Sequence, residues 1–373
     1  MRFGEQDILL PTTMVGSWPR PLWLRGGVIR ESAENLDYTD MYQRSLYEDA
    51  VRLCVKDQDL AGLDIVTDGN QYFEGETPYD KIQMLFVPLR LAGFRAYGPP
   101  GNVAGLEHYF RPVVADKIRW VRPIFGPVLQ AMKLATDKPF KININSGPAT
   151  VATWCEDQYY GDEQALRTDV ADAFNRELRW LADNGAHFVQ LTEQSYIASG
   201  GRDDWSVELM NRAADGVDAH LTWHMCYGNA REFDSLYPDV NASCLAELFK
   251  SGQHIDWNEI HLETARPAMA ELPTLRTWTD RDGTNLGIGV IEVMNPHVET
   301  AEEVATRLRE ALKHVDADHL IVSTDCGLYQ LPRDLAFRKL CSLVAGTRIV
   351  RRELGRHPDG RALSVAGGLP SRQ

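Results

Sequence analysis

The chain has 373 residues, of which 44% are hydrophobic and 25% are charged, as is ordinary for a globular protein with a large buried core. Its formal net charge of −14 argues against a nucleic-acid partner, because contacts to phosphate groups require clustered Lys and Arg. The sequence contains no apolar stretch of about 18 residues and no signal-peptide pattern at its N-terminus. We therefore expect a cytoplasmic enzyme with no membrane partner.

Eight short apolar runs, each bounded by polar or glycine-containing loops, are predicted to be strands. They are residues 12–15, 61–67, 140–146, 186–192, 219–226, 257–263, 286–293 and 319–325. Most of these runs precede a helical pattern, and the clearest helices are predicted at 39–60, 163–184, 299–315 and 333–352. Strand and helix in alternation, repeated eight times, predict an α/β fold of the (β/α)8 TIM barrel type, with residues 1–373 forming one catalytic domain.

A barrel of this type needs only about 250 residues, so the chain has room for insertions. The largest predicted insertion, roughly 70–139, follows the second strand and is rich in proline and aromatic residues. We expect it to form a lid over the barrel or part of an interface in a homo-oligomer. The segment 354–373, rich in Gly, Pro and Arg, is expected to be an extended tail.

Polar and metal-binding residue types follow the predicted strands, where barrel enzymes place their active sites. His224 and Cys226 are two residues apart in one strand, so their side chains point to the same side. Cys326 follows the last strand, and Glu263 ends the strand between them. Alone, His224 or Cys326 is better explained as a buried polar group or a small core thiol, and a glutamate such as Glu263 is common at barrel ends, but together the four residues predict a shared zinc site.

The predicted ligand set favours one kind of chemistry. Zinc bound by two thiolates, an imidazole and a carboxylate is electron-rich and therefore a poor Lewis acid towards a carbonyl group. A thiol substrate that joined this zinc would lose its proton near neutral pH and remain nucleophilic as a zinc thiolate. The site therefore predicts a zinc-dependent S-alkyltransferase, in which a small thiol attacks an electrophilic carbon of an alkyl donor.

Several motifs, in order, resemble the catalytic half of cobalamin-independent methionine synthase and its single-barrel relatives. They are Val15-Gly-Ser-Trp-Pro19, Ser146-Gly-Pro-Ala-Thr150, Trp223-His-Met-Cys-Tyr227, Leu262-Glu-Thr-Ala-Arg266 and Asp325-Cys-Gly-Leu328. The resemblance runs from Thr12 to about Arg352, and it implies that His224, Cys226, Glu263 and Cys326 are zinc ligands. It also implies that Ser17 contacts the amino-acid part of homocysteine and that Trp154 contacts the pterin of a folate donor. A turn-forming serine and an ordinary loop tryptophan are the alternatives for these two residues.

Three departures from the methionine synthase pattern concern substrate binding. Asn70 and Thr192 stand where methionine synthases have carboxylates for the homocysteine ammonium, and Met294 stands in the strand that supplies their catalytic histidine. Met294 cannot donate a proton, and a buried ammonium without anions is costly. These departures favour a thiol without an ammonium group and a donor other than methyltetrahydrofolate.

The best match among the single-barrel relatives is the epoxyalkane:coenzyme M transferases, which form 2-hydroxyalkyl-coenzyme M. On that hypothesis Arg20 or Arg202 meets the sulfonate, Asn295 at a predicted strand end contacts substrate, and Glu193, Asn70 or Tyr227 stabilises or protonates the alkoxide.

Two alternatives stay open. In the first, the chain transfers a methyl group to homocysteine from methyltetrahydrofolate or a methylcobamide, with Asn70 and Thr192 as neutral acceptors for the amine. In the second, it is a non-catalytic, zinc-holding accessory protein, for instance one that receives a corrinoid carrier.

Overall fold

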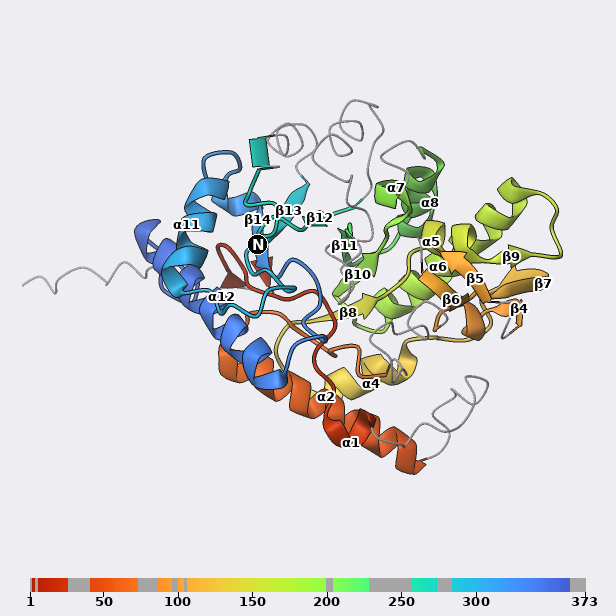
Figure 1. The fold of residues 1–373 in the computed structure, drawn as a ribbon, viewed down its shortest axis with the longest axis horizontal. Helices are drawn as coiled ribbons and strands as arrows, with labels where there is room; N and C mark the ends of the chain where they lie inside the picture. The colour runs from red at the N-terminus through yellow and green to blue at the C-terminus, as the bar shows by residue number, and fades with distance from the viewer. Residues whose placement is uncertain are drawn as a thin grey trace, which may run out of the picture.

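A seven-stranded, fully parallel sheet forms the centre of the molecule (Figure 1). The computed structural model describes residues 2–3, 6–25, 41–72, 86–95, 100–103, 106–198, 204–227, 257–270, 272–273 and 284–362. In spatial order the strands are β14 (Leu320–Ser323), β13 (Asn285–Gly289), β12 (Glu259–Leu262), β11 (His220–His224), β10 (Phe188–Thr192), β8 (Phe140–Ile144) and β3 (Val66–Thr67). Because this order follows the chain order, the sheet curls as a barrel does.

The eighth position of the barrel is filled by the segment predicted as the first strand, 12–15. It forms only one isolated parallel bridge, between Thr12 and Val322, and not a regular strand. The Thr13 N–H donates to the Val322 carbonyl (2.9 Å), and the Ile65 N–H donates to the Thr12 carbonyl (3.0 Å). The segment therefore joins β14 to the chain just before β3, which confirms the predicted (β/α)8 barrel.

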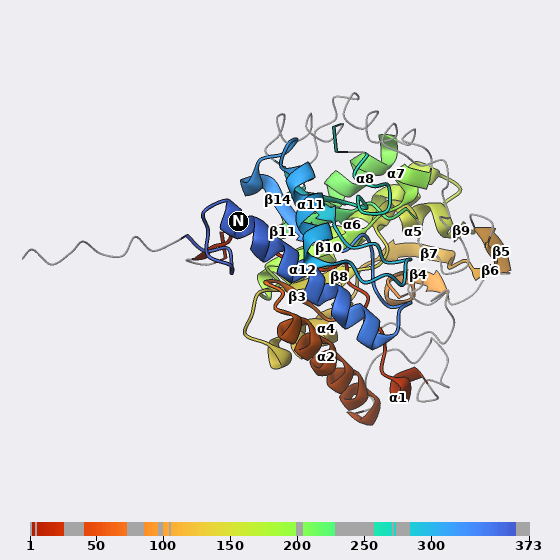
Figure 2. The ribbon, with the colours of Figure 1, turned by 60° about the vertical axis from the view of Figure 1, so that its left-hand side comes forward.

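Helices cover the outside of the sheet. They are α1 (Leu22–Arg25), α2 (Met41–Ala61), α4 (Gly126–Ala135), α5 (Pro148–Trp154), α6 (Glu163–Asp183), α7 (Ser195–Ala198), α8 (Asp204–Ala214), α11 (Ala301–Ala311) and α12 (Arg333–Glu353). Helices α2 and α12 pack side by side along one flank, and α6 packs on α8 (Figures 1 and 2). Among the described residues, no helix is long and apolar enough to cross a membrane.

Local signals in the sequence set the helix ends. Asp162 caps α6 by accepting from the backbone of Gln164 (2.9 Å), and the helix ends at Asp183, with Asn184 as its C-cap before Gly185, which has a positive φ of 88°. Helix α11 opens with the predicted capping box, in which Thr300 accepts from the Glu303 N–H and Glu303 accepts from the Thr300 N–H. All four long helices were predicted with ends correct to within a few residues.

The predicted insertion 70–139 divides into two parts. Its last part contains α4, which packs on α2 and β8 as a helix of the barrel itself. The earlier described part forms small sheets: β4 (Ala92–Arg95) and β7 (Val113–Arg119) pair in one, which β9 (Glu156–Asp157) from outside the insertion joins, and β5 (Pro100–Val103) and β6 (Leu106–Phe110) pair in another. Strand β7 contacts α6, so this part lies beside the barrel (Figure 1). Its roles as lid or interface stay predictions.

The predicted tail 354–373 begins as folded structure. Arg356 forms an antiparallel bridge with Ala362, and the Leu9 N–H donates to the Gly360 carbonyl (3.1 Å). Gly360 has a positive φ of 83°, and a Cβ there would lie 2.7 Å from the Ile8 side chain. The expectation of an extended tail is therefore wrong for residues 354–362, and the rest of it lies outside the described residues.

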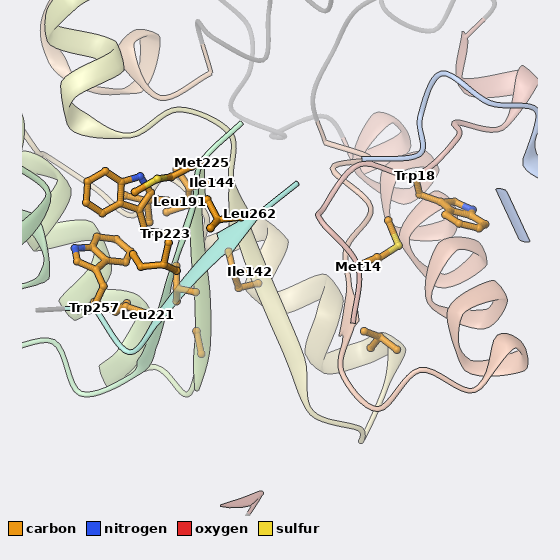
Figure 3. Packing of buried hydrophobic residues seen from close by; sticks show 14 of the residues in the cluster. Met14, Trp18, Ile142, Ile144, Leu191, Leu221, Trp223, Met225, Trp257 and Leu262 are labelled. Carbon is orange, nitrogen blue, oxygen red and sulfur yellow. The ribbon is translucent and has the colours of Figure 1, made fainter. Parts of the chain in front are cut away.

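Side chains alternate along the barrel strands between an apolar face and a polar face. Ile142, Leu191, Trp223 and Leu262 belong to the main hydrophobic core (Figure 3). The alternate positions point to the barrel interior and are polar and buried: Lys141, Asn143, Gln190, Thr222, His224, Glu259 and His261. The barrel interior is therefore much more polar than the branched apolar layers that usually fill such barrels.

Candidate metal centre

Four side chains with metal-binding atoms meet at the carboxyl ends of three strands. His224 is the last residue of β11 and Cys226 follows it by two residues. Glu263 directly follows β12, and Cys326 lies three residues beyond β14. One ligand atom from each of the four residues lies within 4.8 Å of the others. The structure thus brings together all four residues that the sequence predicts as metal ligands.

The geometry of this cluster fits a tetrahedral zinc ion. The Sγ atoms of Cys226 and Cys326 are 3.8 Å apart. Two sulfurs on a tetrahedral zinc, each about 2.3 Å from the metal, are also about 3.8 Å apart. His224 and Glu263 are fully buried, and among the described residues His224 Nε2 has no hydrogen-bond partner. A buried nitrogen without a partner is costly, and a bound cation would remove that cost.

The two thiols also need a cation if both are to be ionised. The neighbouring Cys226 thiol and then burial raise the pKa of Cys326 well above its ordinary value. Thiols in such surroundings lose their protons when they bind a metal, because the metal charge outweighs both effects. The donor set therefore suits a soft or borderline cation such as zinc.

Two hydrogen bonds orient the candidate ligands. His224 Nδ1 lies 2.8 Å from Nδ1 of His261, a buried residue on the neighbouring strand β12. Burial and the nearby His224 hold the pKa of His261 well below its ordinary value, so this ring is neutral. The Tyr227 N–H donates to Glu263 Oε1 (2.8 Å). Contacts of this kind fix the tautomer and direction of metal ligands.

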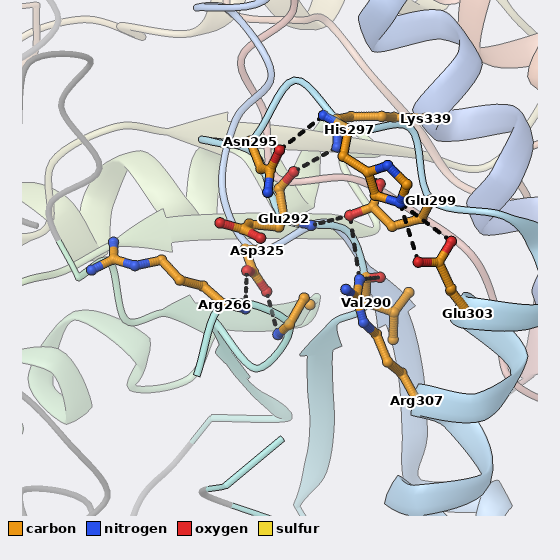
Figure 4. Close-up of polar contacts among 12 residues, drawn as sticks. Arg266, Val290, Glu292, Asn295, His297, Glu299, Glu303, Arg307, Asp325 and Lys339 are labelled. Atoms are coloured by element: carbon orange, nitrogen blue, oxygen red, sulfur yellow. Dashed lines mark hydrogen bonds and ion pairs between the residues drawn. The ribbon is translucent and has the colours of Figure 1, made fainter. Parts of the chain in front are cut away.

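Asp325 joins two of the ligand loops. Its carboxylate accepts from the backbone N–H groups of Thr264 (3.0 Å), Ala265 (2.9 Å) and Arg266 (2.9 Å), and Figure 4 shows the bond from Arg266. Burial raises the pKa of Asp325 to about 7, and these bonds oppose that shift. Because Thr264 follows Glu263 and Asp325 precedes Cys326, this one side chain holds the two ligands in register.

A buried ion-pair cluster holds the loop after β13 against helix α12. Lys339 donates to Glu299 Oε2 (2.8 Å) and to the Glu292 carbonyl (2.9 Å), and the Glu292 N–H donates to Glu299 Oε1 (2.9 Å; Figure 4). Strand β13 ends at Gly289, earlier than the predicted 293. Met294 and Asn295 therefore lie in this loop, several residues beyond the strand end.

The candidate substrate residues Ser17 and Asn70 lie together beside the cluster. Asn70 Nδ2 donates to Ser17 Oγ (2.7 Å), and both residues are buried. The Leu328 N–H donates to the Ser17 carbonyl (2.7 Å), and a Cβ on Gly327 would lie 2.7 Å from Ser17 Cβ. Ser17 thus contacts Gly327, which directly follows Cys326, so Ser17 and Asn70 lie beside the candidate metal centre at the carboxyl end of the barrel strands, which we call the mouth.

Glu193, a candidate catalytic acid, is engaged in holding helix ends. It accepts from the Thr150 N–H (2.8 Å), the Thr150 hydroxyl (2.5 Å) and the Ser195 N–H (2.8 Å). Burial raises its pKa, and the bonds from Thr150 and Ser195 oppose the shift. Its carboxylate caps α5 and α7, because the cap residue of α5, Gly147, has no side chain for that purpose.

The other sequence candidates lie at varied places. Thr192 is buried at the end of β10, Tyr227 is buried next to Cys226, and Trp154 is half-buried at the end of α5. Arg20 is half-buried and donates to the Asn70 carbonyl (3.4 Å). Asn295 is exposed and accepts from the His297 N–H (2.9 Å), so it forms a turn, while Arg202 lies outside the described residues.

Of the buried polar atoms that have no hydrogen-bond partner in the described residues, four lie at successive strand ends. They are Asp68 Oδ1 after β3, Ser146 Oγ after β8, Thr192 Oγ1 at the end of β10 and His224 Nε2 at the end of β11. Such atoms are rare in folded proteins unless water or a ligand satisfies them. Four such atoms at one end of the barrel make this end a candidate site for a polar ligand.

The sequence analysis did not single out Lys141, Gln190, Asn143 or His261. A signal for them exists, because each occupies the polar side of a strand whose other side is apolar. His261 lies two residues before Glu263, and Asn143 lies two before Asn145, so each pair shares one face. The pattern shows which residues share a face but not which of them touch.

Comparison with known proteins yields one family. Residues 10–348 match the family model described as the cobalamin-independent synthase, catalytic domain. A methionine synthase of Sulfurisphaera tokodaii is 33% identical over 347 residues, covering 93% of this chain and 94% of that protein. A methionine synthase of Saccharolobus solfataricus is 33% identical over 350 residues, covering 93% and 97%.

Solved structures give the same result. A B12-independent methionine synthase from Shewanella sp. W3-18-1, in complex with selenomethionine, superimposes with a TM-score of 0.78 at 28% identity, covering 93% of this chain and 99% of that one. A putative vitamin-B12 independent methionine synthase from Listeria monocytogenes, at 18% identity and a TM-score of 0.65, shares the fold.

Proposed function

Since this chain belongs to the cobalamin-independent synthase catalytic-domain family, we propose that it is a zinc-dependent methyltransferase that methylates a small thiol of the homocysteine type. The observation that carries the proposal is the cluster of His224, Cys226, Glu263 and Cys326 within 4.8 Å. A zinc ion held by these four side chains would lower the pKa of a substrate thiol and keep its sulfur nucleophilic.

Methyl transfer is favoured over epoxide opening by the relatives. The two archaeal proteins of 33% identity are methionine synthases, and the structure of 28% identity is a complex with selenomethionine, the selenium analogue of the methyl-transfer product. The alternative of methionine-type methyl transfer therefore replaces the epoxyalkane:coenzyme M transferase reading as the leading hypothesis. Coenzyme M stays a useful test compound because Asn70 and Thr192 are not carboxylates.

Other residues would orient the candidate metal ligands and bind the substrate. Tyr227 and His261 orient the ligands Glu263 and His224, and Asp325 holds the two loops that carry Glu263 and Cys326. Ser17 and Asn70 line the mouth beside Cys326, where the non-thiol end of the substrate would bind. Their positions would align the thiol with the methyl donor, and holding two reactants in the correct orientation lowers the barrier to reaction.

Metal analysis tests the assigned centre. We expect the native protein to bind one zinc ion per chain, and Cys326→Ala and His224→Ala to lose most of the zinc and all thiol alkylation. Cys155→Ala is the matched control, because Cys155 is half-buried at the end of α5 and belongs to no metal-binding group among the described residues. Full zinc occupancy in both ligand variants would overturn the assigned centre.

Substrate assays test the reaction. We expect the zinc-loaded protein to form methionine from homocysteine with either methyltetrahydrofolate or a methylcobamide as donor. Alkylation of coenzyme M by a short epoxide, with no methylation of homocysteine, would instead restore the epoxide reading. Bound zinc without alkylation of any thiol, by any of these donors, would favour a zinc-holding accessory protein.

A further inference from the structure

A chain of five hydrogen-bonded, buried polar side chains runs through the barrel interior from Lys141 of β8 to Ser17, beside the candidate metal centre, and the proposed chemistry uses only its last two members, Asn70 and Ser17. The four bonds, each from donor to acceptor, are Lys141 Nζ to Gln190 Oε1 (2.6 Å), Gln190 Nε2 to Asn143 Oδ1 (2.7 Å), Asn143 Nδ2 to Asn70 Oδ1 (3.0 Å) and Asn70 Nδ2 to Ser17 Oγ (2.7 Å). Every member is less than a tenth exposed. A buried chain of this length is costly unless each member is satisfied.

The direction of the chain follows from its first member. An amide group can donate from nitrogen or accept at oxygen, so a row of amides alone could run either way. A lysine ammonium has three donors and no acceptor, so Gln190 must turn its oxygen towards Lys141. Its nitrogen then faces Asn143, and the same choice repeats at Asn143 and at Asn70. The buried charge therefore determines which end of Asn70 reaches the mouth.

Tight packing keeps the amides in line. A Cβ on Gly16 would lie 2.0 Å from Asn143 Nδ2 and 2.9 Å from Asn70 Nδ2, so only glycine fits at that position. Asn70 has a positive φ of 52°, a conformation that asparagine adopts more readily than most residues. The backbone conformation at Asn70 and the absence of a side chain at Gly16 both serve to bring these two amides together.

The mouth end of the chain offers hydrogen-bond donors. Ser17 Oγ accepts from Asn70, and Asn70 is its one hydrogen-bond partner among the described residues. Ser17 Oγ lies beside Gly327, the residue that follows the candidate ligand Cys326, and because Oγ accepts from Asn70, its own hydrogen is left to donate to a ligand there. An acidic group there would accept from Ser17, whereas an ammonium would face the Nδ2 group of Asn70, which donates to Ser17 Oγ (2.7 Å) and to Asn145 Oδ1 (3.4 Å) and has no lone pair to offer it.

We propose that Lys141 is a positioning residue whose buried ammonium fixes the direction of this chain, so that the mouth beside Cys326 donates hydrogen bonds to an acidic group of the thiol substrate. The acidic group is a carboxylate or a sulfonate, since both accept such bonds. The inference rests on the proposed function, because it needs a thiol bound at the candidate metal centre.

Calorimetric binding of small thiols to the zinc-loaded protein tests it. The probes are 3-mercaptopropionate with a carboxylate, 2-mercaptoethanesulfonate with a sulfonate, 2-mercaptoethanol with no charge and cysteamine with an ammonium. We expect the native protein to bind the acidic probes about tenfold more tightly than cysteamine, as one hydrogen bond to a charged group predicts. The preferred acidic probe distinguishes carboxylate from sulfonate.

Two variants distinguish an effect of the hydrogen-bond direction on ligand preference from a general loss of protein stability. Lys141→Met leaves Gln190 free to turn, so the ratio of acidic-probe to cysteamine affinity should fall to about threefold or less, with zinc content and 2-mercaptoethanol affinity unchanged. Asn70→Asp can accept from Asn143 and from Ser17 but cannot donate, so its ratio should invert. Comparing ratios between proteins cancels the intrinsic acidity of each thiol.

The outcomes distinguish the two levels of the proposal. Binding of all four thiols with no charge preference, or an unchanged ratio in folded Lys141→Met and Asn70→Asp, would overturn the role of Lys141 and leave the proposed function standing. Failure of every thiol to bind the zinc-loaded native protein would overturn both.

Discussion

At the scale of single residues, His261 controls the candidate ligand His224. Its Nδ1 lies 2.8 Å from His224 Nδ1, and both rings are buried. If His224 Nε2 binds the metal, Nδ1 of that ring carries the hydrogen and donates to His261, which fixes the ring in the metal-binding tautomer.

Two substitutions at His261 test this role. His261→Leu removes the acceptor at nearly constant volume, and we expect it to weaken zinc binding by about 10- to 100-fold, as loss of such contacts typically does. His261→Asn places an amide oxygen near the position of Nδ1 and should retain most of the affinity. Competition with a chromophoric chelator measures both, and equal affinities for the two variants would contradict the role.

The polar residues inside the barrel mark the limit of what the sequence predicts at this scale. The clustering of His224, Cys226, Glu263 and Cys326 was predictable because each has a side chain of a metal-binding type in a recognisable motif at a strand end. The contacts of Lys141 and His261 were not predictable, because alternation along a strand indicates which residues share a face but not which of them touch. Their roles depend on the register that pairs His224 with His261 across β11 and β12.

At the scale of elements, one side chain from the end of the β10 region caps two helices. Glu193 accepts from Thr150 in the first turn of α5 and from Ser195 at the start of α7. A negative charge at a helix N-terminus is favourable. Because the Glu193 carboxylate is also buried, each hydrogen bond that it accepts contributes to the stability of the folded state.

Glu193→Gln tests whether the residue is structural. The amide would turn one N–H group towards a donor of Thr150 or Ser195, and we expect the free energy of unfolding to fall by about 1 to 3 kcal/mol. Glu163→Gln, at an exposed position in the first turn of α6, should change it by less than about 0.5 kcal/mol. Urea denaturation measures both. Unchanged stability with loss of turnover would support the catalytic role that the sequence suggested.

Element types were more predictable than element lengths. The long helices carry their own start and stop signals, such as the capping box of α11 and the Asn184-Gly185 end of α6. Strands have no such local signals, because their ends depend on the partner. The predicted strand 61–67 shrinks to Val66–Thr67, since Ala61 still belongs to α2 and Gly62 turns the chain at a φ of 92°.

At the scale of the whole molecule, Arg351 of α12 closes the barrel. Arg351 is 1% exposed, and its guanidinium donates to the carbonyls of Leu9 (2.9 Å) and Leu10 (2.9 Å) and to the Asp64 carboxylate (2.6 Å). Asp64 in turn accepts from the Thr12 N–H (2.8 Å). A residue near the end of the chain thus holds the first segment of the barrel between β14 and β3.

Arg351→Met should open this closure. It leaves the carboxylate of Asp64 without its cation and the carbonyls of Leu9 and Leu10 without that donor, so we expect the free energy of unfolding to fall by about 3 to 5 kcal/mol. Arg348→Met, on the exposed side of the same helix, is the matched control. Hydrogen exchange should be accelerated at the Thr13 amide, which bonds to Val322. Unchanged protection of this amide would mean that the strand pairing alone closes the barrel.

Closure should also reach the metal centre. The segment that Arg351 holds continues to Ser17, whose carbonyl accepts from Leu328 and whose side chain contacts Gly327, next to Cys326. If this segment loosened, Ser17 would no longer hold the loop that carries the candidate ligand Cys326. We expect Arg351→Met to bind zinc more weakly than Arg348→Met at a temperature where both remain folded. Equal zinc affinity would show that the ligand loops are held by β11, β12 and β14 without help from barrel closure.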